Sequence, residues 1–364
     1  MKHLLPFAWG LFVFTNAWSA DPPPAKTNDE GFRLAMPGYH FSFPRDHAAH
    51  PEFKTEWWYF TGHLAEKGKT EPSLGYELTF FRTALTAKPV TTNSNWSLRD
   101  IHFAHVAISD LKQGNFWFAE KISRGALGLA GAETSKLHSW IEDWSLTEAK
   151  DGVWNLHAKA DGRSIDLQLQ PAKPVVIHGE DGVSRKAKGE GHATHYVSFT
   201  RMKTSGRVTL PDRILEVSGE SWHDHEFGTN QLTSDQAGWD WFSLQFDSGE
   251  ELMIYLLRKK NGCFEEASSG TWVDSKGAAT HLTIGEISVL SRDAWKSGKS
   301  GAVYPSRWEI RIPGRGVNVV VEPLLADQEL RVKESSTMAY WEGSCRVTGS
   351  HTGRAYVELT GYEK

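Results

Sequence analysis

Short alternating segments separated by glycine turns are the feature that most constrains the fold of this chain. The clearest aromatic or β-branched runs cover residues 57–61, 76–81, 165–169 and 317–321, and turn dipeptides begin at Asp151, Asp161, Asp181, Ser248 and Asn261. Apolar and polar residues alternate within such runs, which is typical of strands. No long segment keeps the 3.6-residue period of an amphipathic helix. We therefore predict an all-β chain of many short strands, arranged in barrels or sandwiches.

The length and charge of the chain narrow the possibilities further. Its 364 residues are too many for one small domain and suit two domains. The 40 Lys and Arg against 45 Asp and Glu give a net charge of −5, and no basic block stands out. Because phosphate neutralisation needs clustered basic residues, nucleic acid is excluded as an expected partner.

A weak internal repeat indicates how the two domains are related. Residues 57–64, followed by 78–82, resemble residues 239–246, followed by 253–258. Each half then has a tryptophan-led strand, a glycine turn and an alternating strand that ends in proline, in residues 153–171 and 307–323. Chance similarity between aromatic strands is the alternative, but the ordered recurrence favours duplication. We predict antiparallel β-barrels over 36–215 and 216–364.

The N-terminus has the pattern of a secretory signal. The basic start Met1-Lys2-His3 precedes an apolar run without charges, and small residues reach Ser19 and Ala20 before a proline cluster. This predicts a signal peptide over 1–20, cleaved near Ser19 or Ala20, and hence export to the periplasm or medium. The apolar run is shorter than the ~20 residues of a membrane span. Residues 21–35 are polar and proline-rich, which predicts a disordered lead.

Cys263 and Cys345 are the only cysteines. Two cysteines are too few for a fold that is held together by several disulfides, although they could pair in an oxidising compartment. Two free thiols fit the sequence equally well.

A segment near residue 224 holds two histidines, an aspartate and a glutamate between aromatic residues. Because strand side chains alternate, Trp222, Asp224 and Glu226 should share one face, and His223 and His225 the other. Whichever face is buried, it buries ionisable groups, which costs several kcal/mol unless these groups are paired or have a function. This segment is therefore the leading candidate for a functional site.

Asp224 is the candidate catalytic acid. Burial beside Trp222 would favour the neutral carboxyl group and raise its pKa. A neutral carboxylic acid in an apolar pocket can protonate an alkene or a leaving group. We expect His195 to lie near Asp224 and to hold or relay the proton, and Trp222 and Trp241 to stabilise a cation.

A metal site is the rival interpretation of the same segment. His223 and His225 share a face, and His192 or His195 could add a third ligand, as catalytic zinc requires. Two histidines at this spacing are a weak signal, so we predict no metal and no cofactor. A plain structural role, with His225 and Glu226 hydrogen-bonded at a barrel end, is the third interpretation.

Aromatic residues on both faces of residues 56–60 indicate a second wall of the site. One face would pack in a core and the other would line a cavity, unless both belong to the core. We expect Trp58 and Tyr59, together with Glu226, Trp222 and Trp241, to contact a ligand. The Gly-x-Ser-x-Gly elbow of serine hydrolases and glycine-rich phosphate loops are absent from the sequence.

These motifs together resemble the carotenoid 1,2-hydratase (hydroxyneurosporene synthase) family, which is CrtC/AttH-like and often labelled "predicted secreted hydrolase". The resemblance runs from about residue 31 to residue 362. It rests on segments 56–64, 222–228, 238–242, 327–329, 340–343 and 357–362.

The resemblance implies two lipocalin-like barrels in tandem with a cavity for a small apolar ligand. It also implies that Asp224 protonates a terminal isoprenoid double bond, with His195 as the supporting histidine. This chain departs from the hydratases at Val197, where they have an aromatic residue, and at Trp222, where they have tyrosine. A carotenoid is therefore not the required substrate.

Three functions follow from this evidence. The first is a cofactor-independent hydratase or lyase acting on an isoprenoid-like or other hydrophobic molecule. The second is a non-catalytic periplasmic carrier of lipids that works with an ABC-type transporter. The third is a metal-dependent hydrolase that uses His223 and His225.

Overall fold

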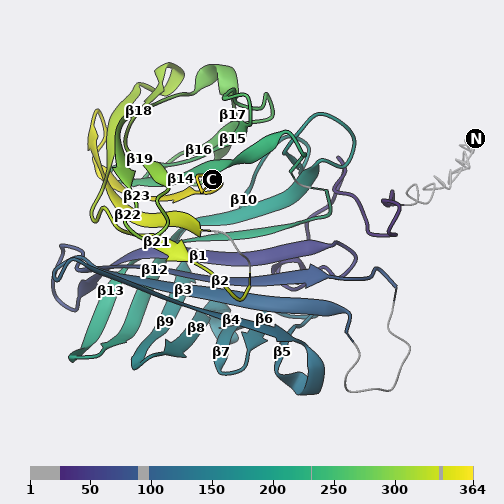
Figure 1. Ribbon diagram of the computed structural model, residues 1–364, viewed down its shortest axis with the longest axis horizontal. Helices are drawn as coiled ribbons and strands as arrows, with labels where there is room; N and C mark the ends of the chain where they lie inside the picture. The colour runs from purple at the N-terminus through teal and green to yellow at the C-terminus, as the bar shows by residue number, and fades with distance from the viewer. Residues whose placement is uncertain (1–24, 89–97, 231, 336–338, 364) are drawn as a thin grey trace, which may run out of the picture.

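The computed structural model describes residues 25–88, 98–230, 232–335 and 339–363 (Figure 1). The predicted signal peptide, 1–20, lies outside these residues. In the described ranges no helix is long and apolar enough to cross a membrane. Helical structure there is confined to short 3-10 turns, η1 (Arg45–His47), η2 (Ala126–Gly128), η3 (Lys150–Gly152), η4 (Ile284–Glu286) and η5 (Pro313–Arg315).

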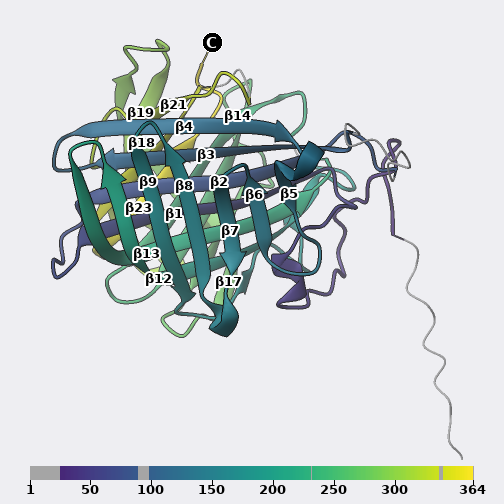
Figure 2. The same cartoon turned by 90° about the horizontal axis from the view of Figure 1, so that it is seen from below.

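The first of two antiparallel sheets has the strand order β4-β3-β2-β1-β13-β12-β9-β8-β7-β6-β5, with β10 and β11 pairing with β12. It curls until β6 contacts β3 and β4, and β5–β9 cross beneath β1–β4 (Figure 2). Its strands are β1 (Thr55–Glu66), β2 (Leu74–Ala84), β3 (Asp100–Asp110), β4 (Asn115–Arg124), β5 (Ala130–Ala132), β6 (His138–Ile141), β7 (Trp144–Glu148), β8 (Trp154–Ala160), β9 (Arg163–Pro171), β10 (Val176–Ile177), β11 (Ser184–Arg185), β12 (Ala193–Leu210) and β13 (Arg213–Gly228).

The second sheet has the order β17-β16-β15-β14-β23-β22-β20-β19-β18, with β21 pairing with β22. It curls above the first sheet in Figure 1. Its strands are β14 (Gln236–Phe246), β15 (Glu251–Lys259), β16 (Ser269–Val273), β17 (Ala279–Thr283), β18 (Ser288–Lys296), β19 (Val303–Ile312), β20 (Val317–Pro323), β21 (Glu329–Arg331), β22 (Ala339–Gly349) and β23 (Gly353–Leu359). The predicted all-β class with two lipocalin-like, near-barrel sheets is confirmed.

The two sheets share a connection pattern. In each, the first strand pairs with both its successor and the final strand: β1 with β2 and β13, and β14 with β15 and β23. The tryptophan-led repeats lie in β8–β9 and β19–β20, at matching places in the two orders. The topology is therefore duplicated in the same way as the sequence repeat.

Two predicted boundaries differ from the structure. The division at 215/216 falls inside β13, which pairs with β1 and β12 along its length, so the chain changes sheets between Gly228 and Gln236. The end of the predicted disordered lead is packed, since Phe32 and Ala35 are buried and the Arg33 amide donates to the Glu52 carbonyl at 2.9 Å, whereas most of residues 25–31 are exposed. Residues 21–24 lie outside the described residues.

The central strands are buried on both faces. Trp58, Phe60 and Leu64 of β1 point into the core of the first barrel. Trp57 and Tyr59 point the other way and join an aromatic cluster between the sheets. Of the two alternatives for these aromatic residues, the first therefore holds: one face packs in a core and the other lines a cavity. Alternation produces this result because β1 lies between two packed layers.

The cysteines do not pair. Cys345 is buried in the core of the second barrel, Cys263 is exposed, and both are free thiols.

Polar contacts join the two sheets around their apolar interface. Glu251 of β15 is fully buried and accepts from Arg201 Nε at 2.7 Å through one oxygen and from Lys173 Nζ at 2.7 Å through the other. Both cations belong to the part of the chain that forms the first sheet. Because each has little access to water, Lys173 depends on this carboxylate for its charge balance, and Arg201 shares its charge between Glu251 and Glu220.

We expect Glu251→Gln to lower the free energy of unfolding by about 3 kcal/mol, because it removes the carboxylate paired with the nearly buried Lys173 and leaves Arg201 with Glu220 as its remaining ion pair. Urea denaturation followed by tryptophan fluorescence measures this. Glu216→Gln, which breaks the exposed Arg207–Glu216 pair at 3.1 Å, is the matched control and should change stability little. Equal effects of the two substitutions would contradict a cross-sheet role for Glu251.

Candidate functional site

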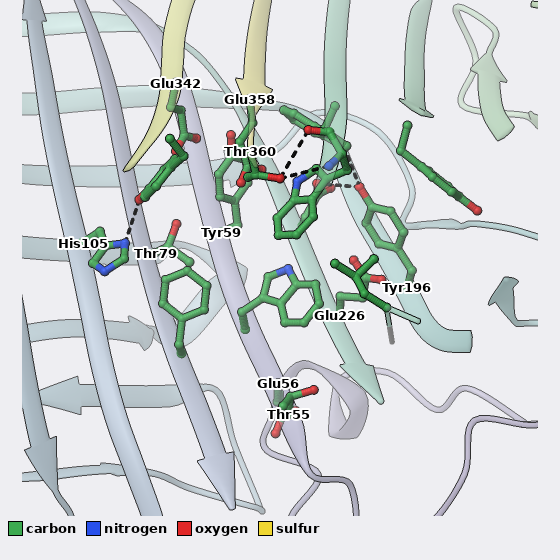
Figure 3. Close-up of a pocket in the computed structure, with 18 of the residues that line it drawn as sticks. Thr55, Glu56, Tyr59, Thr79, His105, Tyr196, Glu226, Glu342, Glu358 and Thr360 are labelled. Atoms are coloured by element: carbon green, nitrogen blue, oxygen red, sulfur yellow. Dashed lines mark hydrogen bonds between the residues drawn. The ribbon is translucent and has the colours of Figure 1, made fainter. Parts of the chain in front are cut away.

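A cavity of about 300 Å³ lies between the two sheets, outside the core of either barrel. Side chains from β1, β2, β12 and β13 of the first sheet and from β14, β15, β22 and β23 of the second line it. Figure 3 shows Tyr59, Tyr196, Glu226, Glu342 and Glu358 around this space. The lipocalin-like resemblance implied a cavity inside a barrel. The barrel interiors are instead filled by their own apolar cores.

The walls of the cavity are largely aromatic. They include Trp57, Tyr59, Trp239, Trp241, Tyr255 and Tyr340. Tyr59 and Trp241 meet edge to face with ring centroids 5.3 Å apart. Trp57 and Trp239 are only partly buried, and Leu232 beside them is 40% exposed, so the entrance lies on this side. Such a cavity favours an apolar ligand.

Three of the five residues that we expected to contact a ligand line the cavity. Tyr59, Trp241 and Glu226 line the cavity as expected. Trp58 does not, because it occupies the opposite face of β1, where its ring stacks on His225 at 4.9 Å inside the first barrel. Trp222 lies behind the cavity wall, next to Trp241.

Asp224 lines the cavity and accepts three hydrogen bonds from neutral donors. Its Oδ1 accepts from Trp222 Nε1 at 2.6 Å and from Ser198 Oγ, and its Oδ2 accepts from the Tyr196 hydroxyl at 2.6 Å. Burial raises the pKa of Asp224 to about 7, although these three donors oppose the rise by stabilising the carboxylate. The group can therefore exist in both protonation states near neutral pH.

His195 is not the partner of Asp224, and that prediction is wrong. Asp224 lies opposite Ser198 in the β12–β13 ladder, whereas His195 lies opposite Phe227. Since strand side chains alternate, His195 projects from the other face of β12. Its Nδ1 pairs with the Gly182 carbonyl at 2.7 Å, and its ring packs against Tyr39, with centroids 4.3 Å apart.

His178 occupies the position that His195 was expected to fill. Its Nε2 lies 2.6 Å from Ser198 Oγ, and its Nδ1 lies 2.8 Å from Thr271 Oγ1 of the second sheet. Burial lowers the pKa of His178 to about 3, so the ring is neutral. A consistent set of donors runs from Thr271 to His178, from His178 Nε2–H to Ser198, and from Ser198 to Asp224. Sequence reasoning missed His178 because it follows the two-residue strand β10 and belongs to none of the motifs found in the sequence.

Glu226 forms an ion pair inside the cavity wall. Lys186 Nζ lies 2.6 Å from Glu226 Oε1, and Thr194 Oγ1 donates to the same oxygen. Although burial would lower the pKa of Lys186, the charge of Glu226 raises it, so the lysine stays protonated. The ammonium lies 4.4 Å from the centre of the Tyr255 ring. Glu226 is therefore a satisfied anion.

Two further carboxyl groups, Glu342 and Glu358, line the cavity, and a third, Glu77, interacts electrostatically with both without lining it. Burial raises the pKa of Glu358 to about 7, and burial also raises the pKa values of Glu77 and Glu342 well above the usual range. The Tyr59 hydroxyl and one oxygen each of Glu77 and Glu342 are buried without a hydrogen-bond partner. This group thus consists mostly of neutral acids rather than anions.

The predicted histidine set for a metal does not assemble. His223 and His225 share a face, but His223 Nδ1 pairs with the Tyr59 carbonyl at 3.0 Å, and His195 lies elsewhere. The structure brings His225 together with His50 and Glu56 instead, all three buried. In the described part of the chain, this is the group of histidine, cysteine or acidic side chains close enough to hold a metal ion.

Comparisons with solved structures identify similar folds. The chain aligns with the crystal structure of NE1406 from Nitrosomonas europaea, a protein provisionally assigned to AttH, with a TM-score of 0.83 and 31% identity over 92% of this chain and 100% of that chain. Kievitone hydratase from Nectria haematococca aligns with a TM-score of 0.65 and 13% identity, covering 93% of this chain and 96% of its own. This second likeness shows a shared fold. Among curated proteins, none matches this chain.

The family follows from a match over nearly the whole chain. The AttH-like family model matches residues 34–362, which include both sheets and every residue of the cavity wall. Together with the full-length alignment to NE1406, this establishes that the chain belongs to the AttH-like family.

Proposed function

We propose that this protein is a cofactor-independent hydratase or related lyase that takes the end of an isoprenoid-like or other hydrophobic molecule into the inter-sheet cavity. The observation that carries the proposal is the position of Asp224, a buried carboxyl group on an aromatic wall with three hydrogen-bond donors behind it. The fold adds support, since a kievitone hydratase shares it.

The proposed reaction needs a single acid and water. Asp224 transfers its proton to one carbon of a double bond, which leaves a carbocation on the more substituted carbon. The faces of Tyr59 and Trp241 stabilise that cation. The oxygen of a water molecule then bonds to the cation, and the extra proton of that water passes to a carboxylate. The sum is alkene plus water giving an alcohol, with no redox change.

The environment of Asp224 suits both halves of this cycle. Burial favours the neutral acid before the transfer, and the three donors stabilise the carboxylate after it, so neither state is strongly trapped. Glu358, which lines the same cavity and whose pKa burial also raises to about 7, is the proposed acceptor of the proton from water. Proton return to Asp224 completes the cycle.

Size limits the part of the substrate that enters. A cavity of about 300 Å³ is at the lower end for small-molecule sites, so a long isoprenoid would insert only its terminal unit between Trp57 and Trp239. The N-terminal sequence pattern supports export to the periplasm or medium as part of the proposal. The enzyme would then meet a substrate delivered outside the cytoplasm.

A lipid carrier is the second candidate. The apolar walls of the cavity and the expected export favour it, and an ABC-type transporter would be its partner. In that function Asp224 and its donors would only orient a bound hydroxyl or headgroup, and no product would form.

Asp224→Asn should reduce hydration by about 10²–10⁴-fold, because the amide keeps the shape but has no acidic proton. The assay follows conversion of neurosporene to its hydrate by mass spectrometry, and tryptophan fluorescence quenching measures binding. Binding should stay near the wild-type value. Glu216→Gln, on the same strand but at the surface, is the control and should keep full turnover.

The same experiment separates the two candidates. Turnover by the wild-type protein that survives in Asp224→Asn would show that another group is the acid. Binding of acyclic isoprenoids without any hydrate from the wild-type protein would favour the carrier.

His178 is a positioning residue in this proposal, since it reaches Asp224 through Ser198. We expect His178→Phe and Ser198→Ala each to lower kcat while leaving substrate binding unchanged, and the double variant to lose no more than the larger single loss. Additive losses accompanied by weaker binding would instead indicate a packing role.

A further inference from the structure

We propose that His50, Glu56 and His225 hold one divalent transition-metal ion, expected to be zinc, inside the first barrel. Two histidines and one carboxylate are a ligand combination that zinc accepts. The site lies on the opposite face of β13 from Asp224, although Glu56 also borders the cavity. It stands whether the protein is a hydratase or a carrier.

The geometry brings the three ligand atoms together around one point. His50 Nδ1 lies 2.8 Å and His225 Nε2 lies 2.9 Å from the same oxygen, Glu56 Oε1. All the candidate ligand atoms lie within 4.8 Å of one another. The three side chains have no measurable exposure to solvent. A metal bound here would therefore have a structural role.

The outward nitrogens of both histidines face oxygens of one residue, Asp46. His50 Nε2 lies 3.1 Å from Asp46 Oδ1, and His225 Nδ1 lies 3.0 Å from the Asp46 carbonyl. Both oxygens accept hydrogen bonds, although Arg45 Nη1 also lies 3.5 Å from His50 Nε2. His225 Nδ1 faces only the Asp46 carbonyl and therefore carries the N–H, so a neutral His225 ring presents a lone pair to Glu56 Oε1. Two electron-rich atoms that face one another at this distance need a proton or a metal cation between them.

Either an extra proton or one divalent ion can supply that positive charge. Without metal, His225 must be an imidazolium ion in a solvent-free position. A divalent ion supplies the positive charge and leaves that ring neutral. Histidine ligands in metal sites commonly donate their second N–H to a carboxylate or a backbone carbonyl. Asp46 offers one of each, which favours the metal.

The surroundings hold this arrangement rigidly. Arg82 Nε donates to Glu56 Oε2 at 3.1 Å, and the same guanidinium contacts Asp100 at 3.0 Å. The positive charge of Arg82 opposes a nearby cation. The carboxylates of Asp46, Glu56 and Asp100 nevertheless surround the site with negative charge, which Arg82 shares with the more exposed Arg45 and Arg99.

Aromatic rings close the site from two sides. Phe227 stacks on His50 with centroids 3.6 Å apart, and Trp58 stacks on His225 at 4.9 Å. A metal here would tie the segment around η1 to β13. The strand that carries Asp224 on its other face would be fixed in place.

The test is the metal content of the full-length, tag-free protein, measured by inductively coupled plasma mass spectrometry. We expect about one zinc ion per wild-type chain. Glu56→Gln and His225→Gln should lose it. His223→Gln is the matched control, because His223 shares the strand and face of His225 but lies outside the ligand set. It should keep the metal.

A second measurement uses only the wild-type chain, in case the ligand variants fail to fold. Protein stripped with a chelator should gain roughly 5 °C in Tm when zinc is restored in large excess over Kd. Cobalt added to the stripped protein in place of zinc should give the visible absorption of a protein-bound cobalt ion. A wild-type chain that purifies without metal and shows neither response would overturn the proposal. So would nitrogen NMR of that protein showing both ring nitrogens of His225 protonated.

Discussion

Burial of the central strands on both faces is the constraint on which the rest of the structure depends. β1 and β13 pair with each other, and each carries one face toward the first barrel and the other toward the second sheet. Along most of β1 and over 221–228 of β13, neither face is free to carry ordinary surface residues, whereas the first half of β13 reaches the surface. Every buried polar side chain on these strands must find a partner or a function, since an unpaired buried polar group costs several kcal/mol.

The two faces of β13 meet that requirement differently. Asp224 and Glu226 face the cavity, where one is held by neutral donors and the other by a lysine. His223 and His225 face the first barrel. Each pairs its Nδ1 with a backbone carbonyl, and His225 Nε2 also lies next to Glu56 Oε1. One strand thus presents carboxyl groups to the cavity on one side and buried histidines to the first barrel on the other.

The position of the cavity explains how a duplicated fold can have a single polar site. The two barrel interiors are filled by large apolar side chains, so neither retains the ligand space of an open barrel. The aromatic faces that remain meet between the sheets, and the acids come from both halves of the chain. Duplication therefore provides two walls of one cavity. Cross-sheet contacts such as Arg201 with Glu251 hold those walls together.

The sequence by itself determined the all-β class, the repeat, and the sharing of one face by Trp222, Asp224 and Glu226, because period-two alternation is a local property of a strand. Only the tertiary structure decided which residues meet those faces. His178 rather than His195 reaches Asp224, Trp57 rather than Trp58 faces the cavity, and His50 and Glu56 join His225. These pairings depend on strand register and on how each sheet curls, which bring together residues up to 175 positions apart (225 − 50). No local pattern encodes that alignment.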